Sequence, residues 1–303
     1  MLFLAACGAG EDAGRPEDRE PAAGPAPEEA ELSLPAVWST RPLAGAIQDL
    51  SLVGGPAPAI AAAYAPRGLQ IFNLEGEVAS ETADLGVAQL ARGAPIVFGD
   101  TPLLLFPGID SEGVLTGYLF GPGLSAPEAV ALPIEAAEPI VALCSQALAG
   151  QQSMGLDLVY WASGASAASR GTLEVGGDAL SYTTAEPGPL PQGATGCVLD
   201  GEDLIFTRAG AQAVLLDRKD AAQFVVLQEG RTFTLGRPGK RALEIEIRPG
   251  LSVDVPSPIK AIDGLGQPRD GGYPGGVIVV AGPTPRGERI VFIDTSALPI
   301  GAD

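Results

Sequence analysis

The segment from Pro58 to Glu77 constrains the fold more than any other part of the chain. Two short apolar runs, Pro58–Tyr64 and Leu69–Leu74, flank a turn at Ala65-Pro66-Arg67-Gly68. Proline presets φ in such a turn, and glycine accepts a positive φ. Glu75-Gly76-Glu77 supplies the next turn. Two apolar runs separated by turn residues in this way predict a β-hairpin.

Degenerate versions of this hairpin recur at residues 97–106, 156–161, 203–216 and 277–294. A hairpin unit that repeats at roughly 40–50 residues is typical of a β-propeller blade. The 41 glycines and 28 prolines are spread along the chain, so they separate many short strands. We therefore predict an all-β chain folded as a six-bladed β-propeller, with a β-sandwich as the alternative all-β fold.

Charge and composition exclude several classes of function. The net charge is −19 and the chain contains no histidine. A negative field of this size repels nucleic acid and anionic lipid headgroups, so no nucleic-acid partner is expected. Without histidine there is no Ser-His-Asp triad, no Cys-His pair and no His-ligated zinc site.

The N-terminal residues divide into two short segments. Residues 1–7 read MLFLAAC and match a bacterial lipobox, with Cys7 as the residue that would be acylated, although the usual basic region is missing. The alternative is a chance cysteine beside small residues. Residues 8–31 are rich in Gly, Ala, Pro and acids, which predicts a disordered acidic tether. We expect an exported protein that is lipid-anchored at Cys7 in the bacterial envelope, in the periplasm or at the outer membrane.

Residues 32–298 form the predicted propeller, and residues 299–303 a C-terminal tail. The first strand, Leu34–Trp38, is expected to pair with the last blade and close the ring, because closure removes free sheet edges. The other predicted blade segments are 49–74, 85–133, 139–187, 196–216 (with 203–206 and 213–216 as strands), 232–255 (232–235, 242–247 and 251–255) and 261–293 (261–265, 276–280 and 290–293).

Four other residues are singled out by the sequence. Cys144 and Cys197 fall at matching inner positions of neighbouring blades, so in an exported protein they are either a disulfide or two buried thiols. Trp38 and Trp161 are expected to pack between blades rather than to form a stacking platform.

Four motifs in order resemble those of the β-propeller phytases. They are Pro35-Ala36-Val37-Trp38, then GLQIFNLEGE at 68–77, then TGCVLDGEDLIFTRAGAQAVLL at 195–216, and the segments IDGL, GGYPGGVIVVAG and RIVFID within 262–294. The resemblance implies a six-bladed fold and a calcium-dependent phosphatase with an acidic, phytate-binding face. Most of the matching acid and lysine positions are replaced, by Ser33, Leu34, Ala65, Pro66, Thr195, Thr207 and Arg208. Asp263 is the acid that matches best, and so the one candidate metal ligand.

Two functions follow from this pattern. The first is a monomeric, non-catalytic lipoprotein propeller that binds a small molecule or an envelope protein, with no cofactor and with the membrane as a partner through Cys7. The alternative is a calcium-dependent phosphomonoesterase of the 3-phytase type, with Ca²⁺ bound at a reduced acidic site. The loss of acidic positions favours the first, because calcium needs many convergent oxygen ligands.

Overall fold

The computed structural model describes residues 32–148, 155–201, 203–217, 223–230, 232–236, 242–267 and 272–299. These residues form strands, turns and loops, and none of the described residues lies in a helix. Accordingly, no helix among them is long and apolar enough to cross a membrane. The prediction of an all-β chain is confirmed, and Cys7 and the tether lie outside the described residues.

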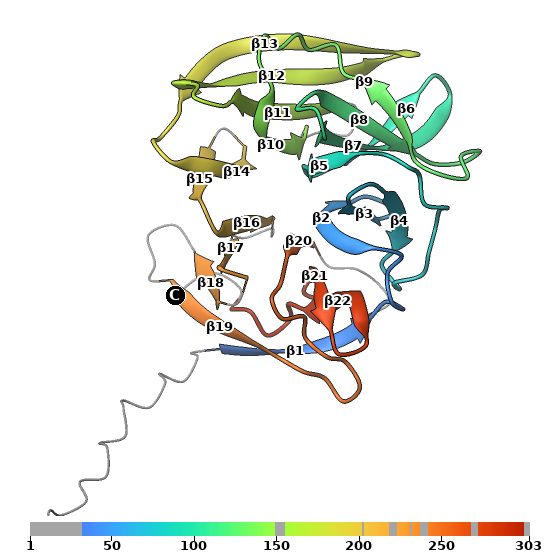
Figure 1. The fold of residues 1–303 in the computed structure, drawn as a ribbon, viewed down its shortest axis with the longest axis vertical. Coiled ribbons are helices and arrows are strands. Elements are labelled where there is room, and N and C mark those ends of the chain that lie inside the picture. Colours follow the sequence, from blue (N-terminus) through green and yellow to red (C-terminus); the bar gives the residue numbers. More distant parts are fainter. Residues whose placement is uncertain are drawn as a thin grey trace, which may run out of the picture.

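The strands form successive antiparallel sheets around a common centre (Figure 1). The first three blades are β2 (Ala46–Val53), β3 (Ala59–Ala65) and β4 (Leu69–Asn73); then β5 (Val87–Leu90), β7 (Thr101–Asp110), β8 (Leu115–Phe120) and β9 (Glu128–Ala131), with β6 (Ala94–Phe98) also paired to β7; then β10 (Ile140–Ala147), β11 (Gly155–Ala162), β12 (Ala167–Gly176) and β13 (Ala179–Pro189).

The remaining three blades complete the circle. They are β14 (Ala194–Asp200) and β15 (Asp203–Arg208); then β16 (Ala211–Leu216), β17 (Gln223–Gln228), β18 (Thr232–Gly236) and β19 (Leu243–Arg248); then β20 (Ala261–Leu265), β21 (Val277–Thr284) and β22 (Gly287–Asp294), with β1 (Leu32–Ser39) at the outer edge. The innermost strands β2, β5, β10, β14, β16 and β20 follow one another around the ring, and β20 contacts β2 again.

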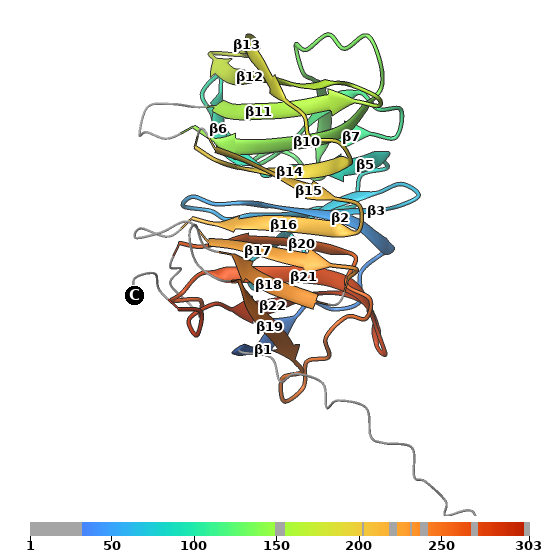
Figure 2. The ribbon, with the colours of Figure 1, turned by 90° about the vertical axis from the view of Figure 1, so that its left-hand side faces the viewer.

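Strand β1 closes the ring from the opposite end of the chain. It pairs antiparallel with β22, where Ala36 lies opposite Ile293 and Trp38 opposite Phe292. The predicted closure is therefore confirmed. Its other edge pairs parallel with β19, with Leu32 opposite Ile245, so β1 joins the fifth and sixth blades into one sheet (Figure 2).

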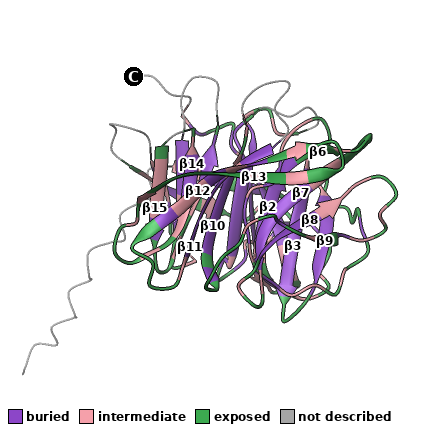
Figure 3. Ribbon diagram, turned by 90° about the horizontal axis from the view of Figure 1, so that it is seen from above, coloured by how far each residue is buried: buried purple, intermediate pink, exposed green. Residues whose placement is uncertain are grey.

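The hydrophobic core consists of six clusters, one between each pair of neighbouring blades. Both faces of the first blade pack against a neighbouring blade. The side chains of its middle strand, β3, are therefore all buried from Ala59 to Tyr64, instead of alternating between buried and exposed. Burial falls toward the outside, and β13 is largely exposed (Figure 3). Six interblade cores around one ring define a six-bladed β-propeller.

The predicted blade boundaries are wrong at two places. Residues Ala213–Leu216 belong to β16, the inner strand of the fifth blade, which leaves the described part of the fourth blade with β14 and β15. Residues 251–255 form no strand, because β1 occupies the outer edge of β19 where a further strand would pair. The alternating apolar pattern of the sequence locates strands but does not say which blade a strand joins.

The two tryptophans differ in their environments. Trp161 is 3% exposed and packs on Phe206 of the next blade, with ring centroids 5.8 Å apart, as predicted. Trp38 is 53% exposed, so the expectation that it packs between blades is wrong. A register shift between Ala36 and Trp38 inserts Val37 as an extra residue in β1, and this bulge changes the direction of the side chains that follow it.

Candidate functional site: the mouth of the central channel

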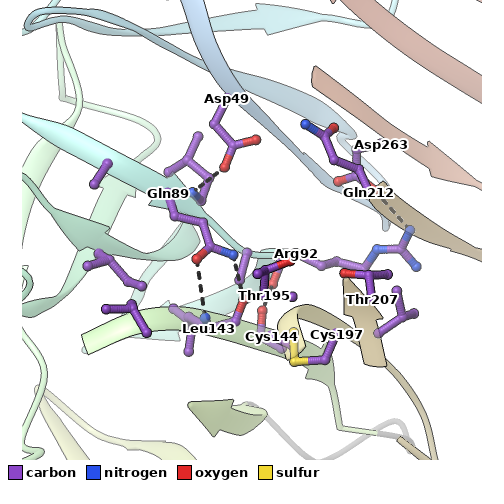
Figure 4. Close-up of a pocket in the computed structure, with 18 of the residues that line it drawn as sticks. Asp49, Gln89, Arg92, Leu143, Cys144, Thr195, Cys197, Thr207, Gln212 and Asp263 are labelled. Carbon is purple, nitrogen blue, oxygen red and sulfur yellow. Dashed lines mark hydrogen bonds and ion pairs between the residues drawn. A yellow bond between two sulfur atoms is a disulfide. The ribbon is translucent and has the colours of Figure 1, made fainter. Parts of the chain in front are cut away.

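A cavity of about 680 Å³ lies at the centre of the ring. All six inner strands line it, through residues that include Asp49, Gln89, Cys144, Cys197, Gln212 and Asp263 (Figure 4). Because it brings residues of every blade together, this cavity is the candidate site.

Four inner strands carry a β-bulge near their beginning. Their pairing with the second strand of the blade shifts between Ile47 and Asp49, and at the corresponding point of β5, β10 and β14. The extra residues are Gln48, Ala88, Val141 and Thr195. All four are exposed and line the cavity. Because a bulge redirects side chains, these residues form the mouth of the channel.

Side chains of the inner strands bridge to the backbone of neighbouring blades, and we call these contacts interblade bridges. The Asp49 carboxylate accepts hydrogen bonds from the amide of Leu50 at 2.9 Å and from that of Leu90, on the second blade, at 2.7 Å. The Gln89 amide donates to the carbonyl of Leu143 at 2.9 Å and accepts from its N–H at 3.3 Å. These bonds satisfy buried backbone groups that face the channel.

Further bridges continue around the ring. Ser51 donates to the carbonyl of Ala91 at 2.7 Å, Gln146 accepts from the amide of Gly201 at 2.9 Å, and Gln212 donates to the carbonyl of Lys260 at 2.7 Å. A disulfide joins Cys144 to Cys197, with Cα atoms 5.8 Å apart, and links the third and fourth blades. Polar side chains of the inner strands therefore hold neighbouring blades together.

Asp263 and Arg92 form an ion pair across the channel. Nη2 of Arg92 lies 3.0 Å from Oδ1 of Asp263, and their side chains are 19% and 11% exposed. The same nitrogen donates to the carbonyls of Leu215, at 2.9 Å, and Gly264. Asp263 also accepts from the amide of Leu52 at 2.6 Å and from its neighbour Gly264. This pair connects four blades at the centre of the ring.

Burial raises the pKa of Asp49 to about 7. The negative charge of Asp263 acts in the same direction, while the amides of Leu90 and Leu50 favour the ionised form and limit the shift. Asp49 therefore changes its charge near neutral pH, but both its oxygens already accept backbone hydrogen bonds.

The site does not fit calcium. Calcium takes roughly six to eight oxygen ligands, and the described residues contain no cluster of three or more acids, cysteines or histidines that would hold a metal ion. Both oxygens of Asp263 are engaged, and the adjacent Arg92 repels a cation. The metal role predicted for Asp263 stays a prediction without support from this geometry.

Some of the residues singled out by the sequence line the cavity and others lie away from it. The structure joins Cys144 to Cys197 and sets Asp263 in the same cavity. Thr195 and Thr207, at positions where the phytase resemblance expects acids, also line the cavity. Ala65, at the end of β3, and Pro66, in the turn that follows, are both exposed, and Leu34 is buried in β1.

Sequence reasoning missed Asp49, Gln89 and Arg92 as residues of this site. A signal exists in the repeats, because an acid or amide stands at or near the beginning of several inner strands. This signal becomes visible only when the inner strands are aligned on their bulges. In that alignment Gln89 of β5 takes the same position as Asp49 of β2, directly after the extra residue.

Comparisons with known proteins agree with this fold. No protein-family model and no curated protein matches the chain. A mutant of AofleA from Arthrobotrys oligospora matches with a TM-score of 0.51 at 12% identity, over 81% of this chain and 83% of that one. A mutant of Aleuria aurantia lectin in complex with Fucalpha1-6GlcNAc also gives 0.51, at 10% identity, over 87% and 100%.

A further structure of the Aleuria aurantia lectin, described as a six-bladed β-propeller with a novel fucose recognition mode, matches with a TM-score of 0.50 at 10% identity, over 87% of this chain and 100% of that one. The shared feature is the fold. Identities this low carry over no binding residue.

Proposed function

We propose that this chain is a non-catalytic propeller that binds a small, uncharged polar ligand at the mouth of its central channel. The observation that carries this proposal is the cavity of about 680 Å³ lined by every blade, in which Asp49, Arg92 and Asp263 are already engaged in holding the blades together. A concave pocket with a few convergent polar groups is the usual form of a small-molecule site.

The charge of the cavity argues against an anionic ligand, because Asp110 and Glu112 also line it. Arg92 is the one cation among its lining residues, and Asp263 neutralises it. A polyanion such as phytate gains no unpaired positive charge there, and Asp49 repels it when ionised. Exposed Gln48 and Thr195 at the mouth offer amide and hydroxyl groups that suit a polyhydroxylated ligand such as a sugar. That the Aleuria aurantia lectin was solved with a fucose-containing disaccharide makes a sugar a reasonable first probe.

On this proposal the chain has a phytase-like propeller without calcium-dependent phosphatase activity, because most of the matching acid positions are replaced. We also place the protein outside the cytoplasm, as a monomer anchored by lipid at Cys7, with residues 8–31 as a spacer between membrane and propeller.

The experiment uses the full chain and measures binding by calorimetry. The probes are methyl α-L-fucoside and myo-inositol as uncharged ligands, with phytate as the anionic comparison, in calcium and in chelator. We expect saturable binding of an uncharged probe, no binding of phytate, and no release of phosphate. Phosphate release that depends on calcium would instead establish the phosphomonoesterase.

A matched pair of variants locates the site. Thr195→Arg places a long cation at the mouth and should abolish binding of the uncharged probe, whereas Thr183→Arg makes the same change on the exposed outer strand β13. Equal binding by both variants, or no saturable binding of either uncharged probe, contradicts a ligand site in the channel.

A further inference from the structure

A second cavity, of about 800 Å³, lies between the first and sixth blades, away from the channel mouth. Its walls include Trp38 of β1, Pro58 in the loop that follows β2, and Tyr273 in the loop between β20 and β21. These loops follow the ends of the inner strands β2 and β20, so the cavity lies on the side of the ring opposite the channel mouth. We call this cavity the Trp38 groove.

Trp38 is a large aromatic surface held in place rather than buried. The bulge at Val37 leaves both residues accessible, with Val37 43% and Trp38 53% exposed. The indole N–H donates to the backbone carbonyl of Glu75 at 2.7 Å. This bond fixes the ring, so little conformational entropy is lost when a ligand packs on it.

Tyr273 supplies a second ring to the lining of the groove. It stacks on the fully buried Phe292, with centroids 6.1 Å apart and an interplanar angle of 23°. Its hydroxyl reaches the carbonyl of Leu74 at 3.5 Å, one residue before the carbonyl that holds Trp38. Two aromatic side chains are therefore anchored to consecutive residues of the same turn.

The groove is electrically negative. Among its described lining residues Glu75 is the one charged group, and it is exposed. Burial, and then the charges of Glu75 and Asp294, raise the pKa of the Tyr273 hydroxyl to about 12. Arg289, on the strand beside β1, is engaged with Ser39 and the carbonyl of Thr40. A ligand in the groove meets aromatic rings, proline and a carboxylate.

We propose that the Trp38 groove binds an organic cation, specifically an alkylated ammonium group, with Trp38 as the aromatic surface and Glu75 as the counter-charge. A cation within about 6 Å of a tryptophan ring is attracted by its quadrupole. Methyl groups on the nitrogen lower its hydration and pack on Pro58 and Tyr273. An anion is repelled by Glu75, and a neutral ligand gains nothing from either charge interaction.

The test uses tryptophan fluorescence of the full chain, because Trp38 is exposed while Trp161, the other tryptophan, is buried. Choline is titrated at constant ionic strength, and 3,3-dimethylbutan-1-ol serves as its neutral isostere of nearly the same shape. We expect a saturable change with choline and binding of the isostere about tenfold weaker, the size of effect that a partly desolvated cation–π contact gives. Equal affinity for the two probes, or no saturable change with choline, overturns the proposal.

Single substitutions test the counter-charge of Glu75 and the aromatic surface of Trp38 separately. Glu75→Gln should weaken choline binding several-fold, and it leaves the carbonyl that holds Trp38 in place. Glu138→Gln makes the same charge change at an exposed residue that does not line the groove, and should have no effect. Trp38→Leu, followed by calorimetry, should abolish binding. Equal effects of the two glutamate variants show only a general charge effect and also overturn the proposal. None of these changes touches the channel, so they do not depend on its ligand.

Discussion

The ion pair between Arg92 and Asp263 gives the sharpest test of how the channel holds the ring together. Arg92→Met removes one partner and leaves the Asp263 carboxylate at the centre of the channel without its counter-charge. It also removes the side-chain donor from the carbonyls of Leu215 and Gly264. Removing one member of a buried pair costs about 3–5 kcal/mol.

For Arg92→Met the expected cost is lower than this range. Asp263 keeps the amides of Leu52 and Gly264 as donors, and the two side chains retain 19% and 11% of their exposure. We therefore expect Arg92→Met to lower the free energy of unfolding by about 2–3 kcal/mol. At about 2–4 °C per kcal/mol for a domain of this size, the melting temperature should fall by about 4–12 °C.

Thermal unfolding followed by circular dichroism measures the shift. Arg248→Met is the matched control, because Arg248 pairs with Glu246 at 2.6 Å but both side chains are about half exposed or more, at 63% and 49%. Such a surface pair contributes less than about 1 kcal/mol. The double change Arg92→Met with Asp263→Asn should cost less than the sum of the single changes, since no unpaired charge remains. If Arg92→Met melts within a degree of Arg248→Met, the pair does not hold the blades together and the reasoning fails.

Three other predictions follow from the same structure. Because the raised pKa of Asp49 favours its protonated form in the folded state, the wild type should lose stability relative to Asp49→Asn as pH rises from 4 to 7. If the melting temperatures of the two proteins change with pH in the same way across that range, this prediction is wrong. Cys144→Ser, or reduction of the wild type, should lower stability by about 2–4 kcal/mol, because the bridge closes a long loop, with chemical denaturation as the measurement and unchanged midpoints as the contrary result. Cys7→Ala should release the protein from the membrane fraction when a precursor with an upstream basic region is expressed, and a variant that still sediments with membranes would disprove the lipid anchor.

The sequence predicts the fold well because the fold depends on features that it displays directly. The hairpin around Gly68 matches β3 and β4, and the pairing of Leu34–Trp38 with the last blade matches β1 and β22. The match of Cys144 and Cys197 at inner positions also corresponds to a contact in space. Short apolar runs with turn residues between them locate strands whatever their partners are.

The candidate sites are harder to predict because bulges determine them. One extra residue at Val37 exposes Trp38, which an alternating pattern of inward and outward side chains places against the core. The extra residues Gln48 and Thr195 likewise open the channel mouth. A bulge has no reliable signature in a single sequence, since it depends on how the partner strand pairs. The function of Arg92 depends on a partner in the sixth blade, which no local pattern indicates.

The two-sided pairing of β1 has a consequence for the order in which the protein is made. This strand is made before the other described strands, yet its partners are residues 245–248 of β19 and 291–293 of β22, near the other end of the propeller. Until those partner strands have been made, Leu34 and Ala36 have no complete core to enter. A polypeptide stopped short of β22 therefore keeps an unpaired edge at both ends of an open ring, which is a template for self-association. The last strand of the propeller to be made therefore determines whether the first one enters the core.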